Sequence, residues 1–272
     1  MAQKVIWSLK DPEITKLIRL GTEKQLRNAT RTCLISSKPL ILDLSTKTGF
    51  RDLIVDKKPK QELPFKFEKL HVVSPKILTR ISGMKNAGNG VAVTLPMPEP
   101  LSVESFDASG MLIVDGVSDP GELGTILRSA SAFSWRKIWI THTCADPFDP
   151  LCIRASQGAL FSVPYRIGSF DNAMKHSRKT TGLLKLHFVG NAKASGVPLG
   201  MTHSTLSETN IKTRNHVGCC FLIQNGLVTE PSSNIRDFKR ITLEGVNDIT
   251  SLPMSVASAT LMHIIRNRYV VS

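Results

Sequence analysis

Residues 111–130 read MLIVDGVSDPGELGTILRSA. The first four are apolar and predict a buried strand. Asp119 and Pro120 then occur in the order that is typical of a helix start, with a capping carboxylate followed by a proline in the first turn. Beyond them, apolar residues recur on one helical face, namely Leu123, Ile126, Leu127, Ala130 and Phe133. This stretch therefore predicts a strand, a tight turn and an amphipathic helix.

The same alternation of strand and helix continues downstream. Apolar strands are expected at residues 137–141, 184–189 and 218–223, and a final helix from Ser255 to about Arg268. Apolar strands separated by helices predict a parallel sheet covered on both faces. Ligands of such sheets bind beyond the carboxyl ends of the strands. We therefore expect a site in the loops after Val114 and Ile223 and before the last helix.

The charge balance indicates a polyanionic partner. The 272 residues include 35 lysines and arginines against 22 acidic residues, which gives a net charge of +13. Such an excess favours nucleic acid, although a basic surface can also serve only solubility. The first hundred residues are the more basic part. They also predict helices around residues 14–20 and 77–84 and strands at 39–42 and 91–95.

Three prolines divide the chain in sequence. Pro96, Pro98 and Pro100 cannot continue a helix or occupy the centre of a sheet. They predict a boundary between a first domain at residues 1–97 and a second domain at residues 98–272, and the basic character of the first domain favours a role in binding RNA or substrate.

The five cysteines have neither disulfide nor zinc-site spacing. We expect them to be reduced, buried side chains of an intracellular protein, and we expect no metal site. No apolar run approaches the roughly 18 residues that a membrane span needs, so no membrane partner is expected.

Residues 111–130 resemble the first motif of the SpoU/TrmH branch of the SPOUT RNA methyltransferases, which runs Asp-Pro-x-Asn-x-Gly-x-x-x-Arg. The matching residues are Asp119, Pro120, Gly124 and Arg128. Residues 154–159 resemble the family's Ala-Ser-x-Gly-Ala segment, and residues 8–14 resemble the start of its substrate-binding domain.

This resemblance implies an α/β fold. The C-terminal SPOUT domain would have a parallel sheet and a trefoil knot, preceded by a small α/β L30e-like domain. It also implies methyl transfer from S-adenosylmethionine to a ribose 2′-hydroxyl of ribosomal or transfer RNA. Arg128 would orient the RNA phosphate and stabilise developing oxygen charge, because a guanidinium is a poor base. On spacing alone, a surface salt bridge is the alternative for Arg128. The basic residues expected to contact RNA are Lys24, Arg27, Arg31 and Arg154.

The sequence departs from the family pattern at three places. Glu122 replaces the motif's Asn, where its charge would face the RNA, although it can also close a capping box with Asp119. The second motif reads Gln224-Asn225-Gly226 instead of Gly-Asn-Glu, and the third reads Ser251-Leu252-Pro253 instead of Ser-Leu-Asn. By position, the cofactor would contact Gln224, Asn225, Gly226, Leu243, Leu252 and Pro253. A Gln side chain in place of Gly could fill the cleft, and the two leucines could be ordinary core.

Three functional alternatives follow. The first is a working enzyme that contacts RNA through Arg128 and Glu122, with ribosomal RNA or a large-subunit precursor as partner. The second is a degenerate member without bound cofactor, acting as an RNA-binding ribosome-assembly factor. The third is one half of a heterodimer with a paralogue, as opposed to a homodimer. The apolar faces of the helix from Asp119 and of the final helix would then lie at a dimer seam, unless they form monomer core. Basicity with a divergent family core favours a mitochondrial location, with the cytoplasm as the alternative.

Overall fold

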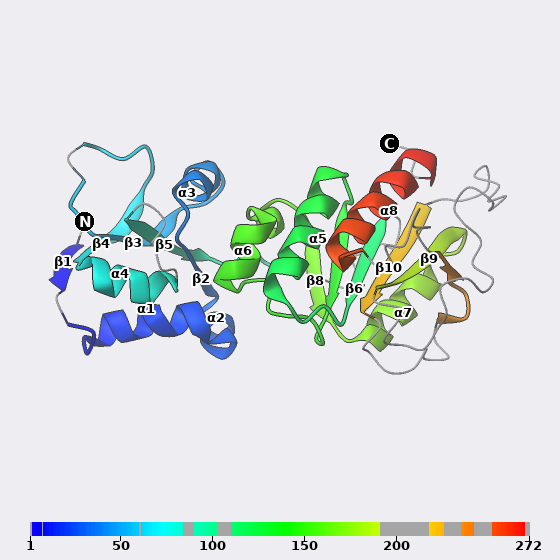
Figure 1. Cartoon of the computed structure of the whole chain (residues 1–272), viewed down its shortest axis with the longest axis horizontal. Coiled ribbons are helices and arrows are strands. Elements are labelled where there is room, and N and C mark those ends of the chain that lie inside the picture. Colours follow the sequence, from blue (N-terminus) through cyan, green and yellow to red (C-terminus); the bar gives the residue numbers. More distant parts are fainter. Residues whose placement is uncertain are drawn as a thin grey trace. The chain divides into compact units, whose positions relative to one another are not determined.

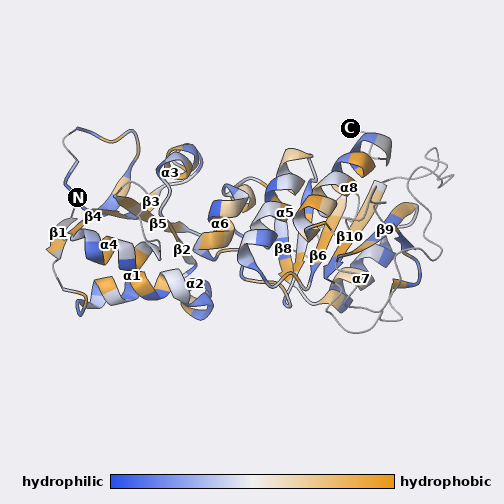
Figure 2. Ribbon diagram, viewed as in Figure 1, coloured by the Kyte–Doolittle hydropathy of each residue, from blue (hydrophilic) through white to orange (hydrophobic). Residues whose placement is uncertain are grey.

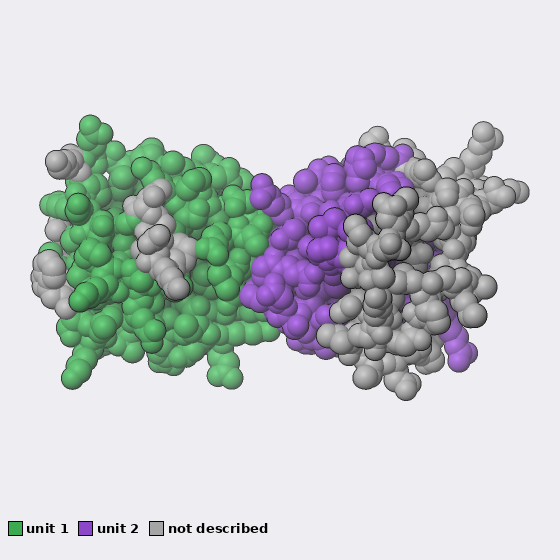
Figure 3. Space-filling model, viewed as in Figure 1, with its two compact units in different colours: residues 1–99, 146–161 green, residues 100–145, 162–272 purple. Residues whose placement is uncertain are grey.

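The computed structural model describes residues 2–6, 8–59, 61–83, 90–102, 110–190, 218–225, 235–241 and 252–269 (Figure 1). The chain forms two compact units (Figure 3). The N-terminal unit comprises Met1–Glu99 together with Asp146–Phe161, and the C-terminal unit comprises Pro100–Ala145 together with Ser162–Ser272. The boundary between Glu99 and Pro100 falls within the predicted cluster of Pro96, Pro98 and Pro100. The assignment of residues 146–161 to the N-terminal unit differs from the sequence-based prediction, which placed them in the second domain.

The N-terminal unit contains a five-stranded mixed sheet in the order β1-β4-β3-β5-β2. Strands β1, β4 and β3 are parallel, whereas β5 runs antiparallel to both of its neighbours. The strands are β1 (Ala2–Ile6), β2 (Thr32–Ile35), β3 (Phe50–Val55), β4 (Phe67–Val73) and β5 (Val91–Pro96).

The helices of this unit are α1 (Pro12–Thr22), α2 (Lys24–Thr30), α3 (Lys38–Leu44), α4 (Pro75–Ser82) and α6 (Pro150–Ser156), and a 3-10 turn, η1, follows at Ala159–Phe161. Apolar side chains of α1 and α4 share one core with β2 and β3, as their helical spacing predicts. The strand predicted at residues 39–42 is wrong. These residues lie in α3, because Pro39 occupies its first turn, where a proline is readily accommodated.

Two contacts hold residues 146–161 within the N-terminal unit. Arg27 is only 2% exposed, and its Nη2 lies 2.7 Å from Oδ2 of Asp146. Gly158 adopts a φ of +70°, and a Cβ there would come within 3.2–3.3 Å of Leu40 and Leu44. A residue other than glycine would therefore meet both backbone strain and a close contact at this position.

The C-terminal unit contains a six-stranded sheet in the order β11-β9-β10-β6-β7-β8. All its strand pairs are parallel, which confirms the predicted parallel α/β fold. The strands are β6 (Met111–Asp115), β7 (Lys137–Thr141), β8 (Tyr165–Gly168), β9 (Leu183–Gly190), β10 (Gly218–Asn225) and β11 (Lys239–Arg240). The helices are α5 (Pro120–Ala132), α7 (Phe170–Lys179) and α8 (Met254–Tyr269). The trefoil knot stays a prediction, since much of the chain beyond β9 lies outside the described residues.

Helices cover both faces of this sheet. Met174 of α7 packs against Met111, Ile113 and Leu222 on one face. On the opposite face, α5 and α8 lie side by side, and α8 contacts β9 and β10 (Figure 1). Strands β6 and β10 are accordingly hydrophobic along most of their length (Figure 2). This arrangement explains why these strands read as continuous apolar runs in the sequence.

The exposure of the side chains tests several of the sequence-based predictions. Leu123, Ile126, Leu261 and Ile265 are fully buried and belong to the monomer core, whereas Ile264 of the same predicted face is half-buried. All five cysteines are free and buried, as expected. Within the described residues, no helix combines the length and the apolar character that crossing a membrane requires.

Candidate active site

The carboxyl ends of β6 and β10 lie next to each other, and the sequence motifs meet there. Gln224 of β10 is paired in register with Asp115 of β6. The loop that follows Asp115 leads directly into α5, whose N-cap Asp119 accepts a hydrogen bond from the backbone N–H of Glu122 at 2.6 Å. This edge is where a parallel sheet of this type binds its ligands.

A chain of polar side chains, buried except for the exposed Thr143, runs across four adjacent strands at this edge. His187 of β9 contacts Gln224 at 3.0 Å, and Gln224 contacts Asp115 at 3.0 Å. Asp115 Oδ1 also accepts hydrogen bonds from Thr141, at 2.7 Å, and from Thr143, at 2.8 Å. We call these five residues the β-edge network. The carboxylate of Asp115 thus has three side-chain donors around it.

The directions of these bonds follow from their chemistry. A carboxylate only accepts, so Gln224 presents its Nε2 amide hydrogens to Asp115 and its Oε1 to His187. His187 must then donate from Nε2. Burial lowers the pKa of His187 to about 4, although the hydrogen bond to Gln224 opposes that shift. The imidazole is therefore neutral near pH 7, in the tautomer that carries the proton on Nε2.

The β-edge network bears on the expectation that the Gln224 side chain could fill the cofactor cleft. Its amide is held by His187 and Asp115, both buried, and Gln224 itself is 8% exposed. The side chain is therefore hydrogen-bonded across the sheet and is not free to swing into a cleft beyond the strand end. Asn225, the next residue, donates from Nδ2 to the carbonyl oxygen of Gly116 at 3.2 Å and so ties β10 to the loop after β6.

Glu122 links α5 to the start of α8. Its Oε1 lies 3.4 Å from the backbone nitrogen of Ser255, whose N–H points to it. The predicted return of this carboxylate to Asp119, as in a capping box, is wrong. The first turn of α8 offers unpaired N–H groups and a positive dipole end, which attract a carboxylate more strongly. Further along, Phe133 lies against His263, with ring centroids 5.1 Å apart, so the starts of α5 and α8 are in contact and later residues of both helices are too.

Leu252 and Pro253 directly precede α8. The carbonyl of Pro253 accepts hydrogen bonds from the backbone N–H groups of Val256 and Ala257, at 3.0 and 3.1 Å, so Pro253 opens the helix as its chemistry predicts. Leu252 is 49% exposed, which excludes the alternative that it is ordinary core. Two further positions predicted to contact cofactor, Gly226 and Leu243, lie outside the described residues.

Arg128 lies on α5 and is exposed. Within the described part of the chain it forms neither a hydrogen bond nor an ion pair, which argues against the surface salt bridge that spacing alone favoured. An exposed guanidinium without a protein acceptor retains all five N–H donors for an anionic ligand.

The four basic residues predicted to contact RNA differ in their environment. Lys24 is exposed, and Arg31 is half-buried and donates to the carbonyl of Pro98 at 2.8 Å. Arg154 is exposed in the last turn of α6. Arg27 is a correction: it is buried and bound to Asp146 and to the carbonyl of Leu20, so it has no surface with which to contact a phosphate.

Sequence reasoning missed four members of the β-edge network: Asp115, Thr141, Thr143 and His187. The signal was present for Asp115, a charged residue directly after an apolar strand. It was also present for His187, a lone imidazole within the apolar strand 183–190. Among the described residues, no group of histidine, cysteine or acidic side chains is arranged to hold a metal ion.

Comparison with known proteins finds similarity to RNA methyltransferases. Residues 110–199 match the model of the SpoU rRNA Methylase family. The uncharacterized tRNA/rRNA methyltransferase slr1673 of Synechocystis is 28% identical over 166 residues, which are 58% of this chain and 60% of that protein. The 23S rRNA (guanosine(2553)-2'-O)-methyltransferase RlmP of Bacillus subtilis is 27% identical over 165 residues, which are 59% and 64% of the two chains. The mouse protein named rRNA methyltransferase 3, mitochondrial, is 48% identical over 54 residues, 20% of this chain and 13% of that protein. The chain thus spans less than two thirds of the length of each.

Solved structures share the fold over nearly the whole chain. The AdoMet-bound rRNA methyltransferase of Sinorhizobium meliloti has a TM-score of 0.75 at 20% identity and covers 99% of both chains. The SpoU methyltransferase AviRb of Streptomyces viridochromogenes has a TM-score of 0.72 at 16% identity, covering 95% of this chain and 98% of that one. At such identities the likeness shows a common fold alone. The family match covers residues 110–199, about a third of the chain, and the first motif of the SpoU/TrmH resemblance lies within it, between β6 and α5.

Proposed function

We propose that this protein is an S-adenosylmethionine-dependent methyltransferase that modifies ribose 2′-hydroxyls of ribosomal RNA. The observation that carries the proposal is the exposed guanidinium of Arg128, the motif's arginine, which has no acceptor among the described residues. The printed name of the Bacillus subtilis relative, a 2'-O-methyltransferase of 23S rRNA, supports the reaction class.

The residues at the carboxyl edge fit the cofactor. Gln224 holds its side chain within the β-edge network, so the glutamine that replaces glycine does not occupy the space beyond the strand. Leu252 exposes an apolar side chain at the start of α8, which suits the face of an adenine ring. The backbone at Gln224 and Leu252 would hold the adenosine. S-adenosylmethionine, when bound there, supplies the methyl group that is transferred.

Arg128 would act on the RNA. Its guanidinium can grip a phosphate through two parallel N–H donors and so fix the adjacent ribose. The same charge stabilises negative charge that develops on the 2′-oxygen as its proton leaves. Arg128 itself does not take the proton, because a guanidinium stays protonated at ordinary pH.

Glu122 would have an indirect role. Because its carboxylate lies at the start of α8, part of its charge is offset by the helix dipole, which reduces repulsion of the approaching phosphate. Glu122 would thus position α8, and with it Leu252, relative to α5. It is therefore a positioning residue in this proposal.

The test is transfer of tritiated methyl groups to ribosomal RNA by the full chain. We expect Arg128→Ala to lower transfer by about a hundredfold or more, because one charge-stabilising donor contributes that much to a comparable transition state. Arg136→Ala removes an exposed arginine of the same unit and is the matched control. Calorimetry should show that both variants bind S-adenosylmethionine as the wild type does.

Two results would overturn the proposal. Undiminished transfer by Arg128→Ala would remove the assigned role of this residue. Absence of both methyl transfer and cofactor binding, with RNA binding retained, would favour the degenerate RNA-binding factor.

Association and location belong to the same proposal. Leu123, Ile126, Leu261 and Ile265 are buried in the monomer, so a homodimer or a heterodimer with a paralogue would use other side chains. Light scattering of the full chain, with and without a paralogue, measures the molar mass in solution and so tests for a homodimer or a heterodimer. The match to mitochondrial rRNA methyltransferase 3 supports a mitochondrial location, which imaging of the tagged full chain tests.

A further inference from the structure

Glu122 is the least engaged of three carboxylates at the carboxyl edge of the C-terminal sheet. Asp115 accepts hydrogen bonds from three side chains, and Asp119 caps α5. The carboxylate of Glu122 makes one contact, in which Oε1 lies 3.4 Å from the backbone nitrogen of Ser255. Within the described residues its Oε2 makes no hydrogen bond, and the carboxylate forms no ion pair. One oxygen of this half-buried residue is therefore left for a ligand.

The segments on either side of this carboxylate lack positive charge. Neither residues 115–127 nor residues 252–265 contain a lysine or an arginine. Arg128 is the first guanidinium on α5, but it follows Glu122 by six positions, which is about 9 Å along the helix axis. Residues at that spacing are not neighbours on a helix surface, so Arg128 does not neutralise the carboxylate. Glu122 thus has no positive counterpart in either segment.

Glu122 lies at the same edge as the residues proposed to hold adenosine. Its contact with Ser255 places the carboxylate at the turn that begins with Leu252. Asn225, at the end of β10, donates to the carbonyl oxygen of Gly116, in the loop that leads into α5. The first turn of α5 is therefore tied to both segments of the cofactor site, and a charge at this position can act on a bound cofactor.

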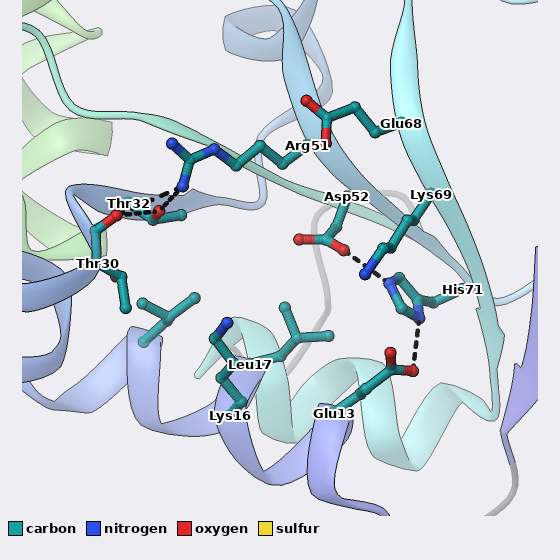
Figure 4. A pocket seen from close by; sticks show the side chains of 11 residues that line it. Glu13, Lys16, Leu17, Thr30, Thr32, Arg51, Asp52, Glu68, Lys69 and His71 are labelled. Carbon is teal, nitrogen blue, oxygen red and sulfur yellow. Dashed lines mark hydrogen bonds and ion pairs between the residues drawn. The ribbon is translucent and has the colours of Figure 1, made fainter. Parts of the chain in front are cut away.

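The pocket between α1, β3 and β4 of the N-terminal unit shows the opposite situation (Figure 4). It has a volume of about 180 Å³, and two of its carboxylates face the same imidazole. Oδ1 of Asp52 lies 2.8 Å from Nε2 of His71, and Oε2 of Glu13 lies 4.0 Å from Nδ1. Lys16 and Lys69 line the pocket as well. These carboxylates face partners within the chain, whereas among the described residues Glu122 faces only a backbone N–H group.

The proposed cofactor carries the charge that Glu122 lacks. The sulfur of S-adenosylmethionine is a sulfonium with a full positive charge, whereas the demethylated product, S-adenosylhomocysteine, has a neutral thioether there. A carboxylate attracts the first sulfur and is nearly indifferent to the second. The two ligands otherwise have the same adenosine, amino group and carboxylate. A negative charge beside the sulfur therefore distinguishes cofactor from product.

We propose that the charge of Glu122 attracts the sulfonium and makes the site prefer S-adenosylmethionine to its demethylated product. The inference rests on the proposed function, which supplies the cofactor. It gives a reason for the departure from the resembled motif, because the neutral asparagine of that motif would not distinguish the two ligands by charge. Loss of the methyl group removes the positive charge, so the product is held less tightly than the cofactor.

The experiment is calorimetric titration of the full chain with three ligands. They are S-adenosylmethionine, S-adenosylhomocysteine and sinefungin, which carries a protonated amine where S-adenosylmethionine has its methylated sulfur. We expect the two cationic ligands to bind about tenfold more tightly than S-adenosylhomocysteine, because a half-buried ion pair contributes more than an exposed pair and less than a desolvated one. Sinefungin separates the effect of the charge from that of the methyl group.

Glu122→Gln tests the carboxylate itself. Glutamine keeps an acceptor oxygen for the N–H group of Ser255 and removes only the charge. The preference should fall to nearly one through weaker binding of the two cationic ligands, and retained binding of S-adenosylhomocysteine shows that the site of the variant is intact. Asp237→Asn is the matched control, since it removes one negative charge from an exposed carboxylate paired with Lys185, near the amino end of β9. It should keep the tenfold preference.

The outcomes separate this inference from the proposed function. Equal affinity of the wild type for S-adenosylmethionine and S-adenosylhomocysteine, or a preference that survives Glu122→Gln, overturns the role of Glu122 even if Arg128-dependent methyl transfer is intact. A preference that sinefungin does not share belongs to the methyl group and overturns it as well. Equal weakening of all three ligands by Glu122→Gln leaves Glu122 only its structural contact with α8. A wild type that binds none of the three ligands overturns both proposals.

Discussion

Each unit of the molecule buries a histidine beside a carboxylate group, but the two clusters are completed differently. In the C-terminal unit, His187, Gln224 and Asp115 form a continuous hydrogen-bonded line across adjacent strands. In the N-terminal unit, Nε2 of His71 contacts Asp52, and Nδ1 makes no hydrogen bond and lies 4.0 Å from Oε2 of Glu13.

The difference has a physical meaning. A buried polar group without a partner costs free energy, so a cluster whose groups are paired contributes to a defined structure. An unpaired buried atom beside a pocket lowers the cost of binding a ligand that pairs with it. The β-edge network therefore positions the sheet edge through a continuous line of hydrogen bonds, whereas the His71 cluster has one ring nitrogen without a hydrogen bond. Both roles can be tested by removing single groups.

The largest effect is expected for Asp115→Ala. Three side-chain donors, from Thr141, Thr143 and Gln224, would lose their acceptor. We expect the free energy of unfolding of the C-terminal unit to fall by about 4 kcal/mol. Urea denaturation followed by the fluorescence of the buried Trp135 and Trp139 measures it. Asp237→Ala, at an exposed carboxylate paired with Lys185, is the control. A similar loss of unfolding free energy in both variants would show that the β-edge network stabilises the unit no more than an exposed ion pair does.

The next effect is a pH dependence of the same unit. Burial lowers the pKa of His187 from 6.5 to about 4. Below about pH 6.5, His187 takes up a proton in the unfolded chain but not in the folded chain, and this favours unfolding. Above that pH neither state is protonated at His187, so the folded state keeps its full stability. Stability is lost as the pH falls towards 4, by about 3 kcal/mol in total. Urea midpoints measured across this range should show the slope in the wild type, and His187→Gln should remove it. A slope that is unchanged in His187→Gln would assign it to other groups.

The smallest effect is expected for Asp52→Asn. The side chain of Asp52 is 22% exposed, and asparagine keeps one acceptor oxygen for His71 or Thr94. We expect a loss of about 1 kcal/mol, measured by hydrogen exchange of the β3 amides. A loss as large as that of Asp115→Ala would end the distinction between the two clusters.

Local signals predicted the centre of the fold. The strand and helix at residues 111–130 follow from an apolar run, an N-cap and a helical period, all within 20 residues of each other. The segment Leu40-Ile41-Leu42 was mistaken for a strand because a short apolar run suits a buried helix equally well.

The clusters depend on tertiary pairing, which a single sequence does not reveal. Gln224 meets Asp115 only because β10 lies beside β6 in this register. The burial of Arg27 depends on Asp146, 119 residues further along the chain. His71 faces Glu13 only because α1 packs against the strand that carries the histidine. The sequence singled out Gln224 and Arg27 for contacts with cofactor and RNA, but it gave no indication of these pairings.

The return of residues 146–161 to the N-terminal unit has a consequence for synthesis of the protein. Asp146 is the carboxylate partner of the buried Arg27, and Gly158 lies against Leu40 and Leu44. A nascent chain that ends before residue 146 leaves a buried guanidinium without its counter-ion, which is strongly unfavourable. The N-terminal unit therefore completes its fold only after two of the six strands of the C-terminal sheet, β6 and β7, have been synthesised. A fragment cut at residue 97 is for the same reason a poor substitute for the full chain in binding experiments.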